Sequence, residues 1–280
     1  MTLPVAPPEP LPGPVIDSHC HLDITTEYSG LTVGEALAAA ADVGVSGVVQ
    51  VGVDLESSQR AVDLAQKHSQ VLAAVALHPN EAPGRSTSLD EDMAALERMA
   101  THPQVVAIGE TGLDHYRTGP DARPAQEAAF REHLRLARRL GLALVIHDRD
   151  AHEDILRVLA DEDVPDRVVF HCFSGDADMA RFCADAGWFL SFPGVLTFKN
   201  AQSLREAAAV VPPEQLLVET DAPFLTPTPH RGQPNASYLM PWTVRRLAEV
   251  TDIDLPRMCS LLRTNTLTAF AVRPDQGFTG

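Results

Sequence analysis

The sequence has little positive charge, because 22 Lys and Arg residues are set against 38 Asp and Glu residues, for a formal net charge of −16. Only two of the basic residues are lysines, Lys67 and Lys199. Nonspecific binding of long nucleic acids needs many Lys and Arg contacts that release counterions. The composition therefore argues against a protein that coats long duplexes. It still allows an enzyme whose bound metal ions supply positive charge locally to a phosphate ester.

Long apolar runs, aromatic residues and closely paired cysteines are also scarce. The longest apolar runs, such as 140–146, are the length of a strand and far below the ~20 residues of a membrane-spanning helix. The four cysteines include no Cys-x-x-Cys pair, and a chain of 280 residues needs no disulfide framework. We therefore expect a cytoplasmic, globular protein with no membrane segment and no obligate protein partner.

The proline-rich start of the chain is set apart from the rest. Residues 1–13 have neither the basic start nor the apolar centre of a signal peptide, and we expect a flexible tail there. Residues 14–280 are expected to form one domain, because α/β barrels of about 250 residues commonly fold as a single unit.

Short β-rich runs alternate with amphipathic helical runs after residue 14. The first predicted strand begins at residue 15, and the others cover 46–53, 71–77, 105–109, 142–146, 167–170, 188–191 and 215–218. Predicted helices cover 32–43, 56–68, 89–101, 125–140, 152–160, 176–186, 201–210, 241–250 and 255–270. Eight strands joined by connections long enough for right-handed crossovers indicate an all-parallel sheet. We predict a single (β/α)8 TIM barrel, since the first strand lacks the G-x-G-x-x-G turn of dinucleotide-binding folds.

Histidines and carboxylates recur at the predicted carboxyl ends of the strands, where active sites of this fold lie. His19 and His21 belong to the first strand, and residues two apart in a strand face the same side. Later strands end in His78, Glu110, His147, His171 and Asp221. One His-x-His pair can be a coincidence of composition, but this whole series on one rim favours a metal site.

The predicted ligands are imidazoles and carboxylates without thiolates, which suits zinc, manganese or magnesium. They outnumber the three protein ligands that an open catalytic metal ion typically keeps. We therefore expect two divalent metal ions per chain, about 3.5–4 Å apart.

An ordered series of motifs resembles the TatD-like metal-dependent hydrolases, a branch of the amidohydrolase-type barrels. The motifs are Ile16-Asp17-Ser18-His19-Cys20-His21-Leu22-Asp23, Leu77-His78-Pro79, Gly109-Glu110-Thr111-Gly112-Leu113-Asp114, Ile146-His147, Phe170-His171-Cys172-Phe173-Ser174-Gly175 and Glu219-Thr220-Asp221-Ala222-Pro223. Characterised members of that family are mainly DNases, often 3′→5′ exonucleases on single strands. The resemblance implies one ion bound by His19, His21, Glu110 and Asp221, and another bound by Glu110, His147 and His171. Glu110 would take the bridging place that a carbamylated lysine fills in many amidohydrolases.

Roles follow for several residues around the predicted ions. Asp221, both ligand and hydrogen-bond acceptor, is our candidate general base, with Glu110 as the second catalytic carboxylate. Substrate binding is predicted for His78, Arg117 and Arg231, since the planar guanidinium of arginine fits phosphate oxygens. Asp17, Asp23 and Glu219 are expected either to orient imidazoles or to serve as caps and buried polar groups. Trp242 and Phe224 are expected to be packing residues and not platforms for bases.

Two positions depart from the family pattern, and the substrate stays open among three classes. Asn80 stands where a second histidine often follows His-Pro, and Gln233 stands where a lysine is often found. The leading hypothesis is a deoxyribonuclease of the 3′→5′ exonuclease type that acts on DNA ends or short single strands. The same metals could instead hydrolyse an ester or amide, such as the aminoacyl ester of a tRNA, as some relatives do. The third class is a metal-binding scaffold without significant turnover.

Overall fold

The computed structural model describes residues 3–273 and residue 276, and within them the strands follow one another in a single sheet in the order β1 to β8. Every strand pair with a described register is parallel. The strands are β1 (Val15–Cys20), β2 (Val45–Val51), β3 (Val71–Val75), β4 (Val105–Asp114), β5 (Ala143–Arg149), β6 (Val168–Phe170), β7 (Phe189–Phe192) and β8 (Leu216–Val218).

At least one helix follows each strand, which is the alternation of the (β/α)8 fold. The helices are α1 (Thr25–Ser29), α2 (Val33–Asp42), α3 (Leu55–Lys67), α4 (Leu89–Met99), α5 (Arg123–Leu140), α6 (His152–Asp161), α7 (Ala177–Asp185), α8 (Gln202–Val210), α9 (Met240–Thr251) and α10 (Leu255–Ala269). The predicted elements match these within a few residues, except that α1 was not predicted and β4 continues five residues beyond its predicted end at residue 109. Among the described helices, none has the length and apolar content needed to cross a bilayer.

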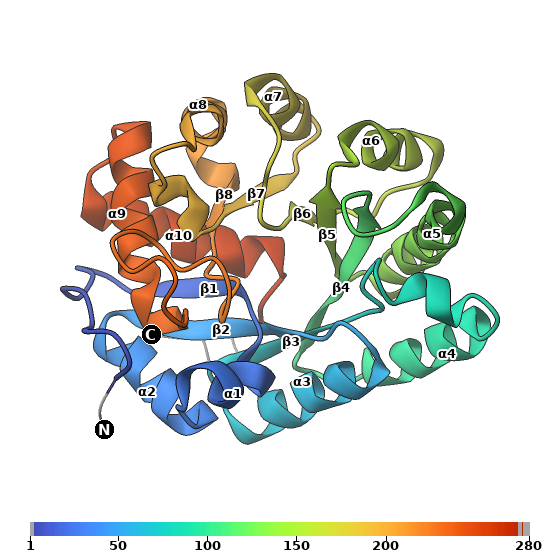
Figure 1. Ribbon diagram of the computed structural model, residues 1–280, viewed down its shortest axis with the longest axis horizontal. Helices are drawn as coiled ribbons and strands as arrows, with labels where there is room; N and C mark the ends of the chain where they lie inside the picture. Colours follow the sequence, from blue (N-terminus) through green and yellow to red (C-terminus); the bar gives the residue numbers. More distant parts are fainter. Residues whose placement is uncertain (1–2, 274–275, 277–280) are drawn as a thin grey trace. The chain divides into compact units, whose positions relative to one another are not determined.

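The contacts divide the chain into two compact units. The first unit contains the described residues within 1–50 and 175–268, and the second contains those within 51–174 and 269–276. In the second unit, β3 to β6 pair side by side with helices α3 to α6 along them (Figure 1). In the first unit, β1 pairs with β2 and β7 with β8, and a bridge joins Cys20 to Ala222 just beyond β8.

Continuous burial of the strands explains their apolar sequences. All five residues of β3 are fully buried, as expected for parallel strands that are covered on both faces. On α5 the predicted apolar stripe is buried at Phe130, Leu134 and Ala137, and the helix ends at Gly141 in the left-handed conformation.

The proline-rich segment before β1 makes fixed contacts in its described part. The backbone of Val5 both donates to and accepts from the hydroxyl of Tyr238, at 3.2 and 3.0 Å, and the amide of Leu11 donates to Val43 O. Val5 and Leu11 are buried. The mobility expected for residues 1–13, and the domain boundary at residue 14, stay predictions.

Candidate metal centre

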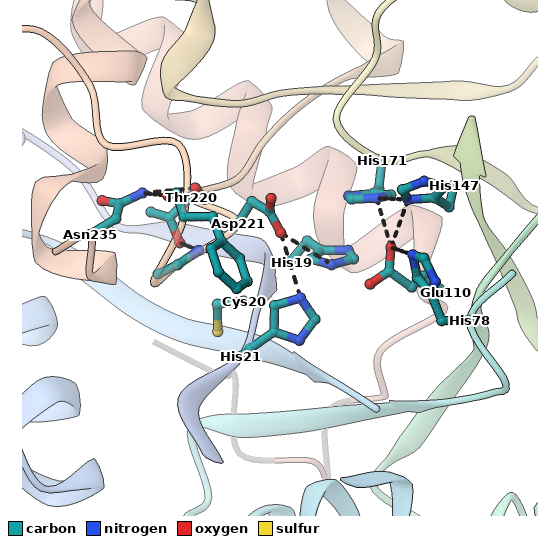
Figure 2. Close-up of polar contacts among 12 residues, drawn as sticks. His19, Cys20, His21, His78, Glu110, His147, His171, Thr220, Asp221 and Asn235 are labelled. Carbon is teal, nitrogen blue, oxygen red and sulfur yellow. Dashed lines mark hydrogen bonds and ion pairs between the residues drawn. The ribbon is translucent and has the colours of Figure 1, made fainter. Parts of the chain in front are cut away.

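In the first unit, His19, His21 and Asp221 lie together. His19 is in β1 and His21 follows it by two residues, and the Nε2 atoms of the two rings are 3.7 and 3.5 Å from Asp221 Oδ1 (Figure 2). The ring centroids are 5.2 Å apart. His19 is fully buried and His21 is 7% exposed, so the rings converge on the carboxylate from the protein interior.

Backbone pairing explains how Asp221, three residues beyond β8, reaches these rings. The amide of Asp221 donates to His19 O at 3.0 Å, and the amide of His21 donates to Ala222 O at 2.8 Å. Asp221 has a φ of 52°, a left-handed conformation that aspartate tolerates better than most residues. Strained conformations of this kind are concentrated at functional sites, where the surrounding contacts hold them.

Asp17 is hydrogen-bonded to Thr220, the residue before Asp221, and to Ser237. Its carboxylate accepts hydrogen bonds from Thr220 N (3.0 Å), Thr220 Oγ1 (2.6 Å) and Ser237 Oγ (2.7 Å). Burial raises the pKa of Asp17 to about 7, although these hydrogen bonds pull the pKa down. Of the two roles expected for Asp17, these contacts fit a buried polar group that ties β1 to the segments after β8.

In the second unit, Glu110, His147 and His171 lie together. Glu110 Oε2 is 2.9 Å from His171 Nε2 and 3.1 Å from His147 Nδ1, and these two nitrogens are 3.4 Å apart (Figure 2). Glu110 is inside β4 and His147 inside β5, while His171 directly follows β6.

The donor set of this cluster fits a divalent cation. Two imidazole nitrogens face one carboxylate oxygen, with the three atoms 2.9 to 3.4 Å apart. Nitrogen and oxygen ligands about 2.0–2.1 Å from a tetrahedral ion are separated from one another by roughly 3.4 Å. The spacing of the three atoms is thus near that of ligands around a single ion.

Asp114 orients His147 from the other side of its ring, a role that the motif around Glu110 does not by itself predict. His147 Nε2 is 3.4 Å from Asp114 Oδ2, so a proton on Nε2 leaves the lone pair of Nδ1 facing Glu110. Burial alone would lower the pKa of His147, but Asp114 and Glu110 outweigh it and raise that pKa. Asp114 is itself buried, yet His147, Arg117 N and Asn80 Nδ2 hold its pKa well below the usual range.

The spacing of Glu110 and Asp114 was a signal available in the sequence. Residues four apart in a strand face the same side, but the strand was predicted to end before Glu110. In the structure β4 includes both residues. Asn80, one of the two departures from the family pattern, donates to Asp114 Oδ2 at 3.1 Å and so supports this carboxylate.

His78 lies beside Glu110 in a tautomer that favours donation. Its Nδ1 accepts a hydrogen bond from the amide of Asn80 at 3.0 Å, so the proton of the neutral ring is on Nε2, 3.8 Å from Glu110 Oε2. Burial lowers the pKa of His78 to about 4, despite the opposing pull of Glu110. His78, Glu110 and His147 each offer one donor atom within 4.8 Å of the others.

The arginines predicted to bind substrate, Arg117 and Arg231, and the aromatic residue Phe224 each make contacts that bear on their expected roles. The backbone amide of Arg117 donates to Asp114 Oδ1, and its side chain is exposed. The guanidinium of Arg231 lies over the ring of Phe198, 3.9 Å from its centroid. Phe224, expected to be a packing residue, meets the rings of His21 and Tyr28 edge-on and is 42% exposed, so its expected role stays a prediction.

The sequence and the fold both match known proteins. Residues 16–271 match the family of TatD-related DNases. A Mycobacterium tuberculosis protein described as an uncharacterized metal-dependent hydrolase, TatD, is 46% identical over 92% of this chain and 98% of its own. An Escherichia coli relative described in the same way, YcfH, is 39% identical over 84% of this chain and 86% of its own.

A solved structure has the same fold. The crystal structure of YjjV, a TatD homologue from Escherichia coli, covers 92% of this chain and 98% of its own with a TM-score of 0.83 and 29% identity. This similarity confirms the predicted (β/α)8 fold. Together with the family match over nearly the whole chain, it shows that the chain belongs to the TatD-related DNase family of metal-dependent hydrolases.

Proposed function

We propose that the chain is a deoxyribonuclease that uses two divalent metal ions to cleave phosphodiester bonds at DNA ends. His19, His21 and Asp221 would hold one ion, His147 and His171 the other, and Glu110 both, as the family resemblance implies. The observation that carries the proposal is that each unit brings imidazole nitrogens to face one oxygen of a carboxylate. Zinc, manganese and magnesium all suit such ligands.

The chain's own groups would bind and orient the phosphodiester and move the proton. When bound, divalent ions lower the pKa of water and neutralise charge on phosphoryl oxygens. Asp221 Oδ1 would accept the proton of the attacking water. His78, neutral with its proton on Nε2, would donate a hydrogen bond to a phosphoryl oxygen. Asp114 would keep the His147 ring in the tautomer whose Nδ1 faces Glu110.

A cytosolic setting and a single-stranded substrate complete the proposal. None of the four cysteines, all among the described residues, forms a disulfide, and thiols are the state that a reducing compartment maintains. The net charge of −16 disfavours a wide electrostatic surface for a duplex, so the substrate would be a DNA end or a short single strand.

The test is the shortening of 5′-labelled single-stranded DNA with added Mg²⁺, Mn²⁺ or Zn²⁺. We expect metal-dependent shortening from the 3′ end, abolished by chelation and reduced at least 100-fold in Glu110→Ala. Equal activity of Glu110→Ala would show a contaminating nuclease. Wild-type protein that binds metal but leaves DNA intact, while it hydrolyses an aminoacyl ester, would contradict the proposal.

A further inference from the structure

Two exposed aromatic rings lie next to the His19–His21–Asp221 cluster in the first unit. Tyr28 on α1 is 49% exposed and Phe224 is 42% exposed, and their ring centroids are 5.6 Å apart at 76°. The Phe224 ring also meets the His21 ring edge-on, with centroids 6.2 Å apart. Adjacent exposed apolar side chains on a globular protein commonly mark a binding surface.

The backbone that carries Phe224 is firmly held. The amide of Phe224 donates to Asp221 O at 2.8 Å, and Asn235 Nδ2 donates to Phe224 O at 2.6 Å. Asn235 is fully buried, and the same Nδ2 donates to Thr220 O at 2.9 Å. The exposure of Phe224 is thus fixed by contacts on both sides of its peptide unit, so the ring is pre-organised to receive a ligand.

A hollow of about 450 Å³ lies beside Tyr28. Its lining includes Tyr28, Phe198, Arg231 and Gln233, together with two prolines, a leucine, a threonine and a glycine. Arg231 is stacked on Phe198, which holds the flat guanidinium in place. The volume is within the range of small-ligand pockets, and the lining offers flat π-faces with a few polar groups.

We propose that Tyr28, Phe224 and the stacked pair of Arg231 and Phe198 bind unpaired bases of single-stranded DNA beside the scissile bond. This inference rests on the proposed function and assigns the residues that would hold the bases of its substrate. Every base presents a π-face, so stacking on aromatic rings grips a strand without requiring a particular sequence. A chain with a net charge of −16 gains little from general attraction to phosphates beyond the metal ions, so stacking would supply affinity that the surface charge does not. Bases inside a duplex are already stacked and paired, so this subsite selects single strands.

Binding without turnover tests the subsite directly. The probe is a fluorescent ten-residue oligothymidylate with cleavage-resistant phosphorothioate linkages, measured by anisotropy with the Mg²⁺-loaded full chain. We expect Phe224→Ala and Tyr28→Ala each to weaken binding about tenfold or more, and Phe224→Tyr to retain it. Phe182→Ala is the matched control and should bind like wild type, because Phe182 on α7 is also exposed (52%) but packs against Trp188.

An abasic strand of the same length separates base stacking from phosphate binding. Wild type and Phe224→Ala should bind the abasic strand with equal affinity. Wild type should bind the abasic strand more weakly than it binds oligothymidylate. Equal affinity of the abasic strand and oligothymidylate for wild type, or an unchanged affinity of Phe224→Ala, would overturn the subsite.

Cleavage of unmodified oligothymidylate separates the two proposals. If Phe224→Ala raises KM about tenfold and leaves kcat within twofold, both stand. If wild type cleaves no DNA but base-dependent binding persists, the nuclease proposal fails and the subsite survives. Cleavage with a KM that Phe224→Ala does not change would retain the nuclease and overturn the subsite.

Discussion

One carboxylate, Asp114, fixes the orientation and the tautomer of the His147 ring. Asp114 is held by Arg117 N at 2.8 Å and Asn80 Nδ2 at 3.1 Å, and it faces the nitrogen of His147 that is turned away from Glu110. A buried carboxylate in that place fixes the tautomer of the ring and raises its basicity toward a cation. Metal binding should therefore depend on Asp114 although Asp114 is not itself a predicted ligand.

Replacing Asp114 tests this positioning role. Asp114→Asn should lower metal affinity about 10- to 100-fold, because the neutral amide binds the proton on His147 Nε2 less strongly and no longer raises the basicity of the ring. Isothermal titration with Mn²⁺ measures the change, and excess metal should restore part of kcat. Asp154→Asn, at a half-exposed carboxylate in the same unit, is the control and should titrate like wild type. An unchanged metal affinity of Asp114→Asn would show that Asp114 does not position His147 for metal binding.

At the scale of elements, strand β4 determines where Glu110 and Asp114 point. Its register against β5 shifts between Ile108 and Thr111, so the strand is irregular on either side of Glu110. Gly112 has a φ of 137°, and a Cβ there would lie 2.1 Å from His147 O. Only glycine allows β4 and β5 to approach this closely at the position where both carry site residues.

Gly112→Ala should destabilise the protein and also disturb the cluster of Glu110, His147 and His171. The methyl group would push against the β5 backbone, so we expect a loss of about 2 kcal/mol or more in the free energy of unfolding, measured in urea. Gly119→Ala is the matched control, since a Cβ there meets nothing within 4 Å and the residue has no positive φ. Equal stabilities of the two variants would show that the close approach is not required.

The alternation of strands and helices was predictable because each element has its own apolar period and its own turn residues. The end of β4 was not, since Gly109 and Gly112 interrupt the β-rich run and their close approach to β5 is a tertiary effect. The predicted ligand positions could be read from strand ends. The exposure of Phe224 could not, because it depends on Asn235, eleven residues further along, holding its carbonyl.

At the scale of the whole molecule, His133 links stability to pH. It is fully buried on α5, where Nδ1 lies 2.6 Å from Ala129 O and Nε2 accepts from Leu77 N at 2.9 Å, the pattern of a neutral ring. Burial lowers the pKa of His133 from 6.5 to about 4. The unfolded chain therefore binds more protons between pH 4 and 6.5, so stability is full above that window and falls as the pH decreases through it.

Urea unfolding at pH 7 and pH 5, with chelator present, measures this contribution. His133 should account for about 2 kcal/mol of the loss between these two pH values. His133→Gln should be less stable than wild type at pH 7 but should lose about 2 kcal/mol less on acidification. A variant with the same pH dependence as wild type would contradict the assignment of a neutral buried ring.

The central claim is that histidines and carboxylates of both units bind two divalent ions, and metal stoichiometry tests it most directly. The protein is saturated with Mn²⁺ or Zn²⁺ and freed of excess metal. The number of metal ions per chain is then measured by inductively coupled plasma mass spectrometry. The account predicts two ions per chain in wild type, and one in His147→Ala/His171→Ala with its fold intact. Wild-type protein without stoichiometric metal, or a double variant that still holds two ions, would contradict it.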